Sequence, residues 1–171
     1  MQNYFELFDL ETSFLVDDEA LKKAYQAQVT RFHPDNFATK SQAVQLQALQ
    51  STSLVNSAYT ALKTPLNRAS YLLNLEDVDP FDEKDTNMDA NFLLSQIELR
   101  EQLEGIKEQQ DSLALDEFIE RVQDFIRDNV ASISEAFIQS KDLQEIKTLV
   151  RELKFYDQLN KEANILMDEW L

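Results

Sequence analysis

Glycine and proline are almost absent from this 171-residue chain, which holds one glycine and three prolines. β-Hairpins depend on glycine or Asn-Gly pairs at their tight turns, so this composition leaves little turn chemistry for a sheet. Apolar residues make up 43% of the chain, which is enough for a packed core, and leucine, glutamine and glutamate, all good helix formers, are abundant. The sequence therefore predicts an all-α fold, arranged as one compact domain or two small ones.

Hydrophobic spacing predicts two helices that flank a short loop in the first part of the chain. Apolar residues recur at three- and four-residue spacing from Leu21 to Phe32, after an N-cap at Asp17 or Asp18. Pro34 ends this helix, because proline lacks an N–H and disfavours helical geometry in the residue before it. A loop over residues 33–41 follows, and the next helix is expected over residues 42–63. Its stripe comprises Leu49, Val55, Tyr59 and Leu62 together with Thr52 and Asn56.

Two further signals divide the chain. Thr64-Pro65 has the form of an N-cap followed by proline at the first helical position, which predicts a short helix to about Leu75. Residues 76–88 are acidic and break the periodicity, so they predict a linker between a first domain, residues 1–75, and a second domain, residues 89–171. Three long helical patterns fill the second domain, at about residues 89–110, 115–139 and 142–169. Their short joints favour antiparallel neighbours and hence a three-helix bundle.

The net charge of −16 is unevenly distributed. The first 75 residues carry seven acids and six bases, whereas the remainder carries twenty-five acids and ten bases. Such an acidic surface repels phosphate backbones and argues against a nucleic-acid partner. One positive island interrupts the pattern and consists of Lys22, Lys23, Arg31 and Lys40 against Asp35 alone. The island predicts an acidic partner surface, although a solvated helix face explains the charges equally well.

Several classes of function find no support in the residues. The chain has no cysteine and one histidine, and it lacks a glycine-rich phosphate loop and a Glu-x-x-His pair. We therefore expect no catalytic site of its own, no cofactor and no bound metal. The N-terminus lacks the pattern of a signal or transit peptide, and no apolar run approaches the roughly 20 residues that span a bilayer. These features predict a cytoplasmic protein without a membrane partner.

The tripeptide His33-Pro34-Asp35 stands between the first two long helices, directly after the basic stretch. With Tyr4-Phe5, Leu21 to Tyr25 and Val55 to Tyr59, it resembles the J-domain family. The resemblance implies that the first domain is an antiparallel helical hairpin that binds a DnaK-type chaperone and stimulates its ATPase. The residues implied in chaperone binding are His33, Pro34, Asp35, Lys22, Lys23 and Arg31. Most J-domains carry lysine after the tripeptide, and this chain has Asn36 there.

A helical wheel of residues 92–106 separates two apolar faces, at 100° per residue. The core stripe is formed by Phe92 with Gln96, Leu99, Leu103 and Ile106, which all lie within about 40° of Phe92. Leu93, Leu94 and Ile97 point elsewhere and are interspersed with glutamates. Either a neighbouring helix covers these three side chains, or they are exposed for binding.

A J-domain followed by an acidic helical domain is similar to the HscB family in its bacterial form. Phe92-Leu93-Leu94, Glu98 to Glu101 and Arg151 to Phe155 carry this closer resemblance. It implies a DnaK-type chaperone partner, HscA, and a client, the iron–sulfur cluster scaffold IscU. The scaffold-binding positions that it implies are Leu93, Leu94, Ile97, Glu98, Glu101 and Phe155. A further acidic position of that set is Gly105 here, so this contact is absent or supplied by Glu104.

The prediction is therefore a two-sided adaptor, a co-chaperone that holds IscU on its acidic domain and stimulates HscA through the tripeptide. Two alternatives remain open from the residues. A general J-domain co-chaperone or an adaptor for another client would share the tripeptide and differ in what the second domain binds. A helical structural or interaction protein would leave the ATPase of every chaperone unchanged.

Overall fold

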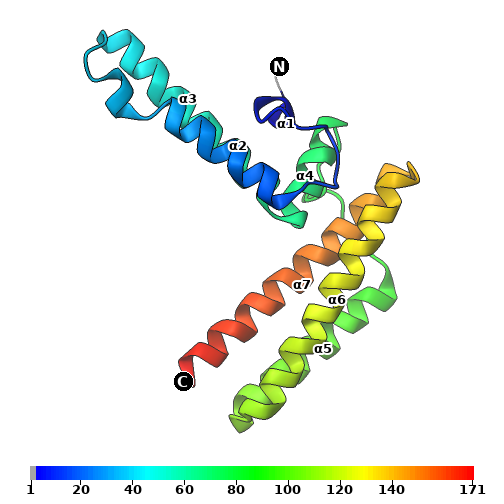
Figure 1. Ribbon diagram of the computed structural model, residues 1–171. Helices are drawn as coiled ribbons and strands as arrows, with labels where there is room; N and C mark the ends of the chain where they lie inside the picture. The colour runs from blue at the N-terminus through cyan, green and yellow to red at the C-terminus, as the bar shows by residue number, and fades with distance from the viewer. Residues whose placement is uncertain (1–2) are drawn as a thin grey trace. The chain divides into compact units, whose positions relative to one another are not determined.

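The computed structural model describes residues 3–171, and all regular elements in that part of the chain are helical (Figure 1). In chain order they are α1 (Tyr4–Leu7), α2 (Asp18–Arg31), the 3-10 helix η1 (Pro34–Phe37), α3 (Gln42–Lys63), α4 (Pro65–Leu75), α5 (Ala90–Gln109), α6 (Ser112–Ile138) and α7 (Leu143–Glu169). They form two compact units, residues 1–75 and residues 76–171. The predicted all-α fold is confirmed.

In the first unit, α2 and α3 lie side by side and η1 stands in the loop that joins them (Figure 1). Asp17 caps α2 by accepting the backbone N–H groups of Glu19 and Ala20. Between the helices, the Tyr25 ring stacks on Tyr59 at 4.0 Å between centroids, and its hydroxyl donates to Asn56 Oδ1 at 2.7 Å. These contacts fix the register of the hairpin.

One position of the predicted α3 stripe faces away from the packed side of this hairpin. Leu21, Val55 and Leu62 are buried, as expected, but Leu49 is 61% exposed. Leu49 precedes Val55 by six residues, which places it about 120° around α3 from that buried position. The prediction that Leu49 belongs to the core stripe is therefore wrong.

A buried arginine ties the first unit together at its other end. Arg68 on α4 donates from Nε to the Phe14 carbonyl at 2.7 Å and from Nη1 to the Leu62 carbonyl at 2.8 Å. It therefore donates to two backbone carbonyls in a region where water is excluded. Removal from water also lowers the pKa of Arg68 from its usual value.

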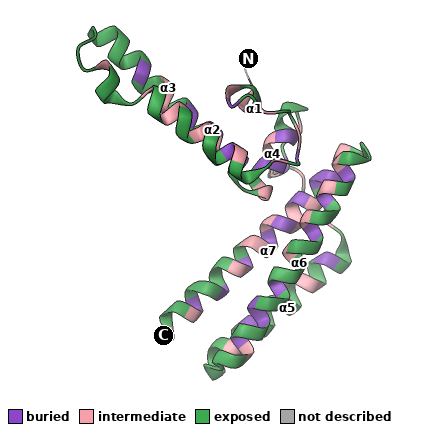
Figure 2. Cartoon of the chain, in the orientation of Figure 1, coloured by how far each residue is buried: buried purple, intermediate pink, exposed green. Residues whose placement is uncertain are grey.

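The second unit consists mainly of α5, α6 and α7. The buried residues of each helix lie on the side that faces the other helices of this unit (Figure 2). Its core includes Phe92, Leu99, Leu103, Leu115, Phe118, Val122, Phe155, Leu159 and Ala163. Three members of the predicted α5 stripe, Phe92, Leu99 and Leu103, are buried, and Gln96 and Ile106 are half-buried. The wheel therefore identified the core face of α5 correctly.

Residues 76–88, predicted as a linker, belong to the second unit. Pro80 is buried, the Lys154 ammonium lies 4.2 Å from the centre of the Phe81 ring, and Met88 packs against the hydrophobic core. Three aspartates, Asp79, Asp82 and Asp85, each accept the N–H two residues ahead, at 3.0 Å. Such turns satisfy the backbone without helical periodicity, so an aperiodic pattern does not imply an unattached segment.

Candidate functional site

The tripeptide lies on the surface at the tip of the first unit. Phe32 ends α2, Pro34 begins η1, and the side chains of His33 and Asp35 are 54% and 90% exposed. The Asp35 N–H donates to His33 Nδ1 at 3.2 Å. Because Nδ1 accepts this proton, the neutral imidazole carries its own proton on Nε2. A histidine donor and an aspartate acceptor are thus both presented to a partner.

Hydrogen bonds to both helices hold the loop in place. Asn36 Nδ2 donates to the Thr30 carbonyl at 2.8 Å, in the last turn of α2. Gln45 Nε2 on α3 donates to the carbonyls of Ala38 and Lys40, at 3.3 and 3.1 Å. Asn36 therefore supplies a loop-anchoring contact in place of the basic contact that lysine would offer at this position. Sequence comparison with the J-domain pattern did not indicate this role.

The basic residues next to the tripeptide are accessible. Lys22, Lys23 and Arg31 on α2 and Lys40 in the following loop are all exposed. Arg31 also lies over the Phe32 ring, with its guanidinium carbon 5.2 Å from the ring centre. An acidic surface that approaches α2 meets several cations within one helix length, which favours rapid association.

The off-stripe face of α5 is not covered by a neighbouring helix. Leu93, Leu94 and Ile97 are 44%, 59% and 55% exposed, and Glu98 and Glu101 are exposed beside them. We call these five residues the α5 patch. Large apolar side chains gathered on one exposed face and bordered by charge are typical of a protein-binding surface. Of the two alternatives left open by the wheel, the structure supports the exposed one.

Phe155, which the resemblance placed with this face, lies instead in the core. It is only 7% exposed and meets the Phe92 ring edge-on at 5.8 Å between centroids. The Arg100 guanidinium carbon lies 5.3 Å from the centre of the Phe155 ring. Most of the Phe155 surface therefore supports α5 from the inner side, and its part in scaffold binding stays a prediction.

Comparisons with known proteins cover both units. Residues 88–164 match the family described as the HSCB C-terminal oligomerisation domain. Over 165 residues the chain is 38% identical to a co-chaperone protein HscB homolog from Photobacterium profundum, with 96% of each chain covered. The chain belongs to the HscB co-chaperone family. The resemblance inferred from the tripeptide and the acidic second domain is thereby confirmed.

Solved HscB structures share this architecture. Chaperone HscB from Vibrio cholerae superposes with a TM-score of 0.88 at 38% identity, covering 99% of this chain and 100% of that one. Human co-chaperone HscB gives a TM-score of 0.89 at 30% identity, covering 96% and 82%. The J-domain followed by a C-terminal helical bundle is thus the HscB arrangement.

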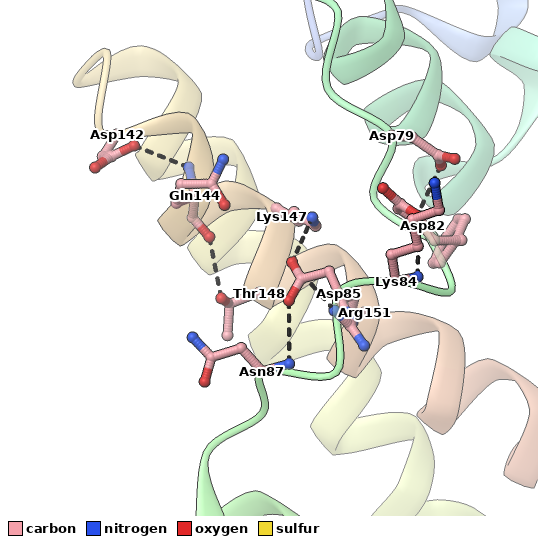
Figure 3. Close-up of polar contacts among 11 residues, drawn as sticks. Asp79, Asp82, Lys84, Asp85, Asn87, Asp142, Gln144, Lys147, Thr148 and Arg151 are labelled. Carbon is pink, nitrogen blue, oxygen red and sulfur yellow. Dashed lines mark hydrogen bonds and ion pairs between the residues drawn. The ribbon is translucent and has the colours of Figure 1, made fainter.

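An ion-pair cluster positions the segment that precedes α5 in this HscB fold. Asp85 accepts from the Lys147 ammonium and from the Asn87 N–H, and Arg151 Nη1 lies 3.5 Å from the same carboxylate (Figure 3). The hydrogen bond from Lys147, followed by that from Asn87, lowers the pKa of Asp85. Lys147 is itself almost fully buried, so this carboxylate is its necessary partner. No pattern in the sequence singled out Asp85 or Lys147, and Arg151 entered only through the HscB resemblance.

Gly105, the departure from the expected acidic set, lies in α5 one turn beyond Glu101. A Cβ at this position would meet nothing within 4 Å. The neighbouring Glu104 is exposed. The local structure therefore imposes no need for glycine here.

Residues 3–171 hold no group of three or more His, Cys, Asp or Glu side chains able to bind a metal ion. Nor does any helix in this range combine the length and the apolar character that a membrane crossing requires.

Proposed function

We propose that this HscB-family protein assists iron–sulfur cluster assembly by binding the scaffold IscU and delivering it to the DnaK-type chaperone HscA, whose ATPase it stimulates. The observation that carries the proposal is the exposed tripeptide, anchored to both hairpin helices beside the positive island, in a member of a co-chaperone family. The acidic second unit and its α5 patch supply the second binding surface.

In this mechanism the tripeptide acts on the conformation of the chaperone and does no chemistry on ATP. Asp35 can accept two hydrogen bonds from one partner arginine, and His33 can donate from Nε2. Pro34 restricts the backbone between them, so little conformational entropy is lost when the contact forms. Binding that favours one chaperone state shifts the population toward that state, and ATP is hydrolysed within the chaperone.

The α5 patch is proposed to bind the scaffold. Leu93, Leu94 and Ile97 would be removed from water on contact, which supplies affinity. Glu98 and Glu101 would attract basic groups of the scaffold, which chiefly accelerates association and sets orientation. Phe155 contributes by holding the inner face of α5 in position.

The chaperone contact is tested by the steady-state ATPase rate of HscA with increasing amounts of the full-length protein. His33→Gln and Asp35→Asn should each abolish stimulation and leave helicity by circular dichroism unchanged. Glu11→Gln, which changes an exposed carboxylate of the same unit, is the matched control and should stimulate normally. A protein that stimulates equally well with Asp35→Asn would refute this role.

Calorimetry with purified IscU tests the scaffold contact. Replacing Leu93 and Leu94 together by alanine should weaken binding by about 2 kcal/mol or more if they are central to the interface. Leu113→Ala removes a leucine of α6 that is 69% exposed, and it should leave affinity unchanged. Equal affinities for the wild type and the double variant would instead favour a different client.

A further inference from the structure

An apolar groove lies beside the tripeptide and shares only Pro34 with the function proposed above. Its volume is about 590 Å³. It is lined by Phe32, Pro34, Phe37, Ala38, Gln42, Gln45, Leu46, Ala48 and Leu49. None of these residues is charged, although the positive island lies nearby, with Lys22, Lys23 and Arg31 on α2 and Lys40 in the loop. The groove is therefore chemically distinct from the basic surface next to it.

The loop side of the groove is held by the same contacts that anchor the tripeptide. Gln45, one of its lining residues, donates to the carbonyls of Ala38 and Lys40. Ser41 caps α3 by accepting the Val44 N–H at 3.3 Å. On the other side, Gln42, Leu46 and Leu49 follow one another at helical spacing along α3. The groove is thus formed within the isolated chain.

Two of its leucines are unusually exposed. Leu46 and Leu49 are 55% and 61% exposed, in the first two turns of α3. Neither contributes to the hairpin core, although the adjacent Ala48 is buried. Paired exposed leucines bordering an apolar groove indicate a surface that is covered in a complex.

We propose that this groove binds an apolar segment of the same DnaK-type chaperone that the tripeptide engages. The inference rests on the proposed function and extends it. Pro34 belongs both to the tripeptide and to the groove lining, so the two surfaces are continuous. A chaperone that contacts His33 and Asp35 from outside the loop also reaches the groove. The chaperone surface would then combine acidic residues facing α2 with an apolar projection facing α3.

Replacing both leucines by glutamine in the full-length protein, Leu46→Gln with Leu49→Gln, tests the proposal through the ATPase titration with HscA. The exposed parts of Leu46 and Leu49 together amount to about one whole leucine side chain that a partner could bury. Losing that burial should raise the protein concentration for half-maximal stimulation about tenfold. The maximal stimulated rate should be retained, because the tripeptide is intact. Leu54→Gln, which changes a 45% exposed leucine of the same helix, is the control and should behave as the wild type.

Ionic strength and a second variant separate the possible results. The loss caused by the leucine substitutions should persist at high salt, whereas the loss caused by Lys22→Glu should depend on salt. If Asp35→Asn abolishes stimulation but the double leucine variant titrates as the wild type, the groove proposal is wrong and the proposed function stands. If Asp35→Asn stimulates normally, the proposed function itself fails. A concentration-dependent dimer that the leucine substitutions disrupt would show that a second copy occupies the groove and would overturn the proposal.

Discussion

Replacing Gly105 by alanine should stabilise the second unit. Gly105 lies in the interior of α5, four residues before its last residue, Gln109, and it is not among the residues with positive φ. A methyl group at this position would meet no atom within 4 Å. Alanine therefore enters without strain, and the change acts through helix propensity and through the conformational entropy of the unfolded chain.

The size of the effect follows from these two terms. Glycine in a helix interior is about 1 kcal/mol less favourable than alanine, and compatible Gly→Ala changes stabilise proteins by about 0.4–1 kcal/mol. For a unit of this size, 1 kcal/mol corresponds to a shift of about 4–8 °C in the melting temperature. Gly105→Ala should therefore raise the melting temperature of the second unit by roughly 2–8 °C.

Urea and thermal unfolding of the full-length protein, followed by circular dichroism, provide the measurement. Ala131→Gly, at an exposed position in the interior of α6, is the reciprocal control and should lower stability by a similar amount. If Ala131→Gly destabilises while Gly105→Ala has no effect or destabilises, α5 has a requirement for glycine that its geometry does not reveal. That result would refute the reasoning.

Three further perturbations have defined outcomes. Asp85→Asn should lower the free energy of unfolding near pH 7, because a carboxyl group with a lowered pKa stabilises the folded state at pH values above the ordinary carboxyl pKa. In urea titrations, the difference between wild type and variant should vanish as the pH falls through the lowered pKa. Burial, and to a lesser degree Asp89, raises the pKa of Glu152, so Glu152→Gln should stabilise the protein near neutral pH and lose this advantage in acid. Arg68→Leu removes two buried hydrogen bonds, to the carbonyls of Phe14 and Leu62, and should cost about 2–5 kcal/mol, measured by urea unfolding.

The helices themselves were largely predictable because their signals are local. Asp17 and the Thr64-Pro65 pair mark the starts of α2 and α4, and the predicted bounds of α3 agree with the structure. The start of α6 was placed three residues late, since the cap at Asp111 precedes its first strongly apolar turn. Caps and periodicity act over one or two turns, so one chain segment contains the information needed to recognise them.

The tripeptide could be recognised from the sequence for the same reason, but its anchoring could not. Pro34 and its two neighbours are adjacent in the chain, whereas the contact from Gln45 comes from a different helix. Asn36 appeared only as a departure from the J-domain pattern. Its hydrogen bond to Thr30 became visible once the loop had a position relative to α2.

By itself, the sequence determined an all-helical chain with a J-domain tripeptide, a positive island and an acidic second half. Only the tertiary structure decided which apolar side chains remain exposed. It left Leu93 and Leu49 at the surface, buried Phe155 against Phe92, and attached residues 76–88 to α7 through Asp85. The physical reason is that helix formation depends on neighbours along the chain, whereas burial depends on which distant segment covers each face.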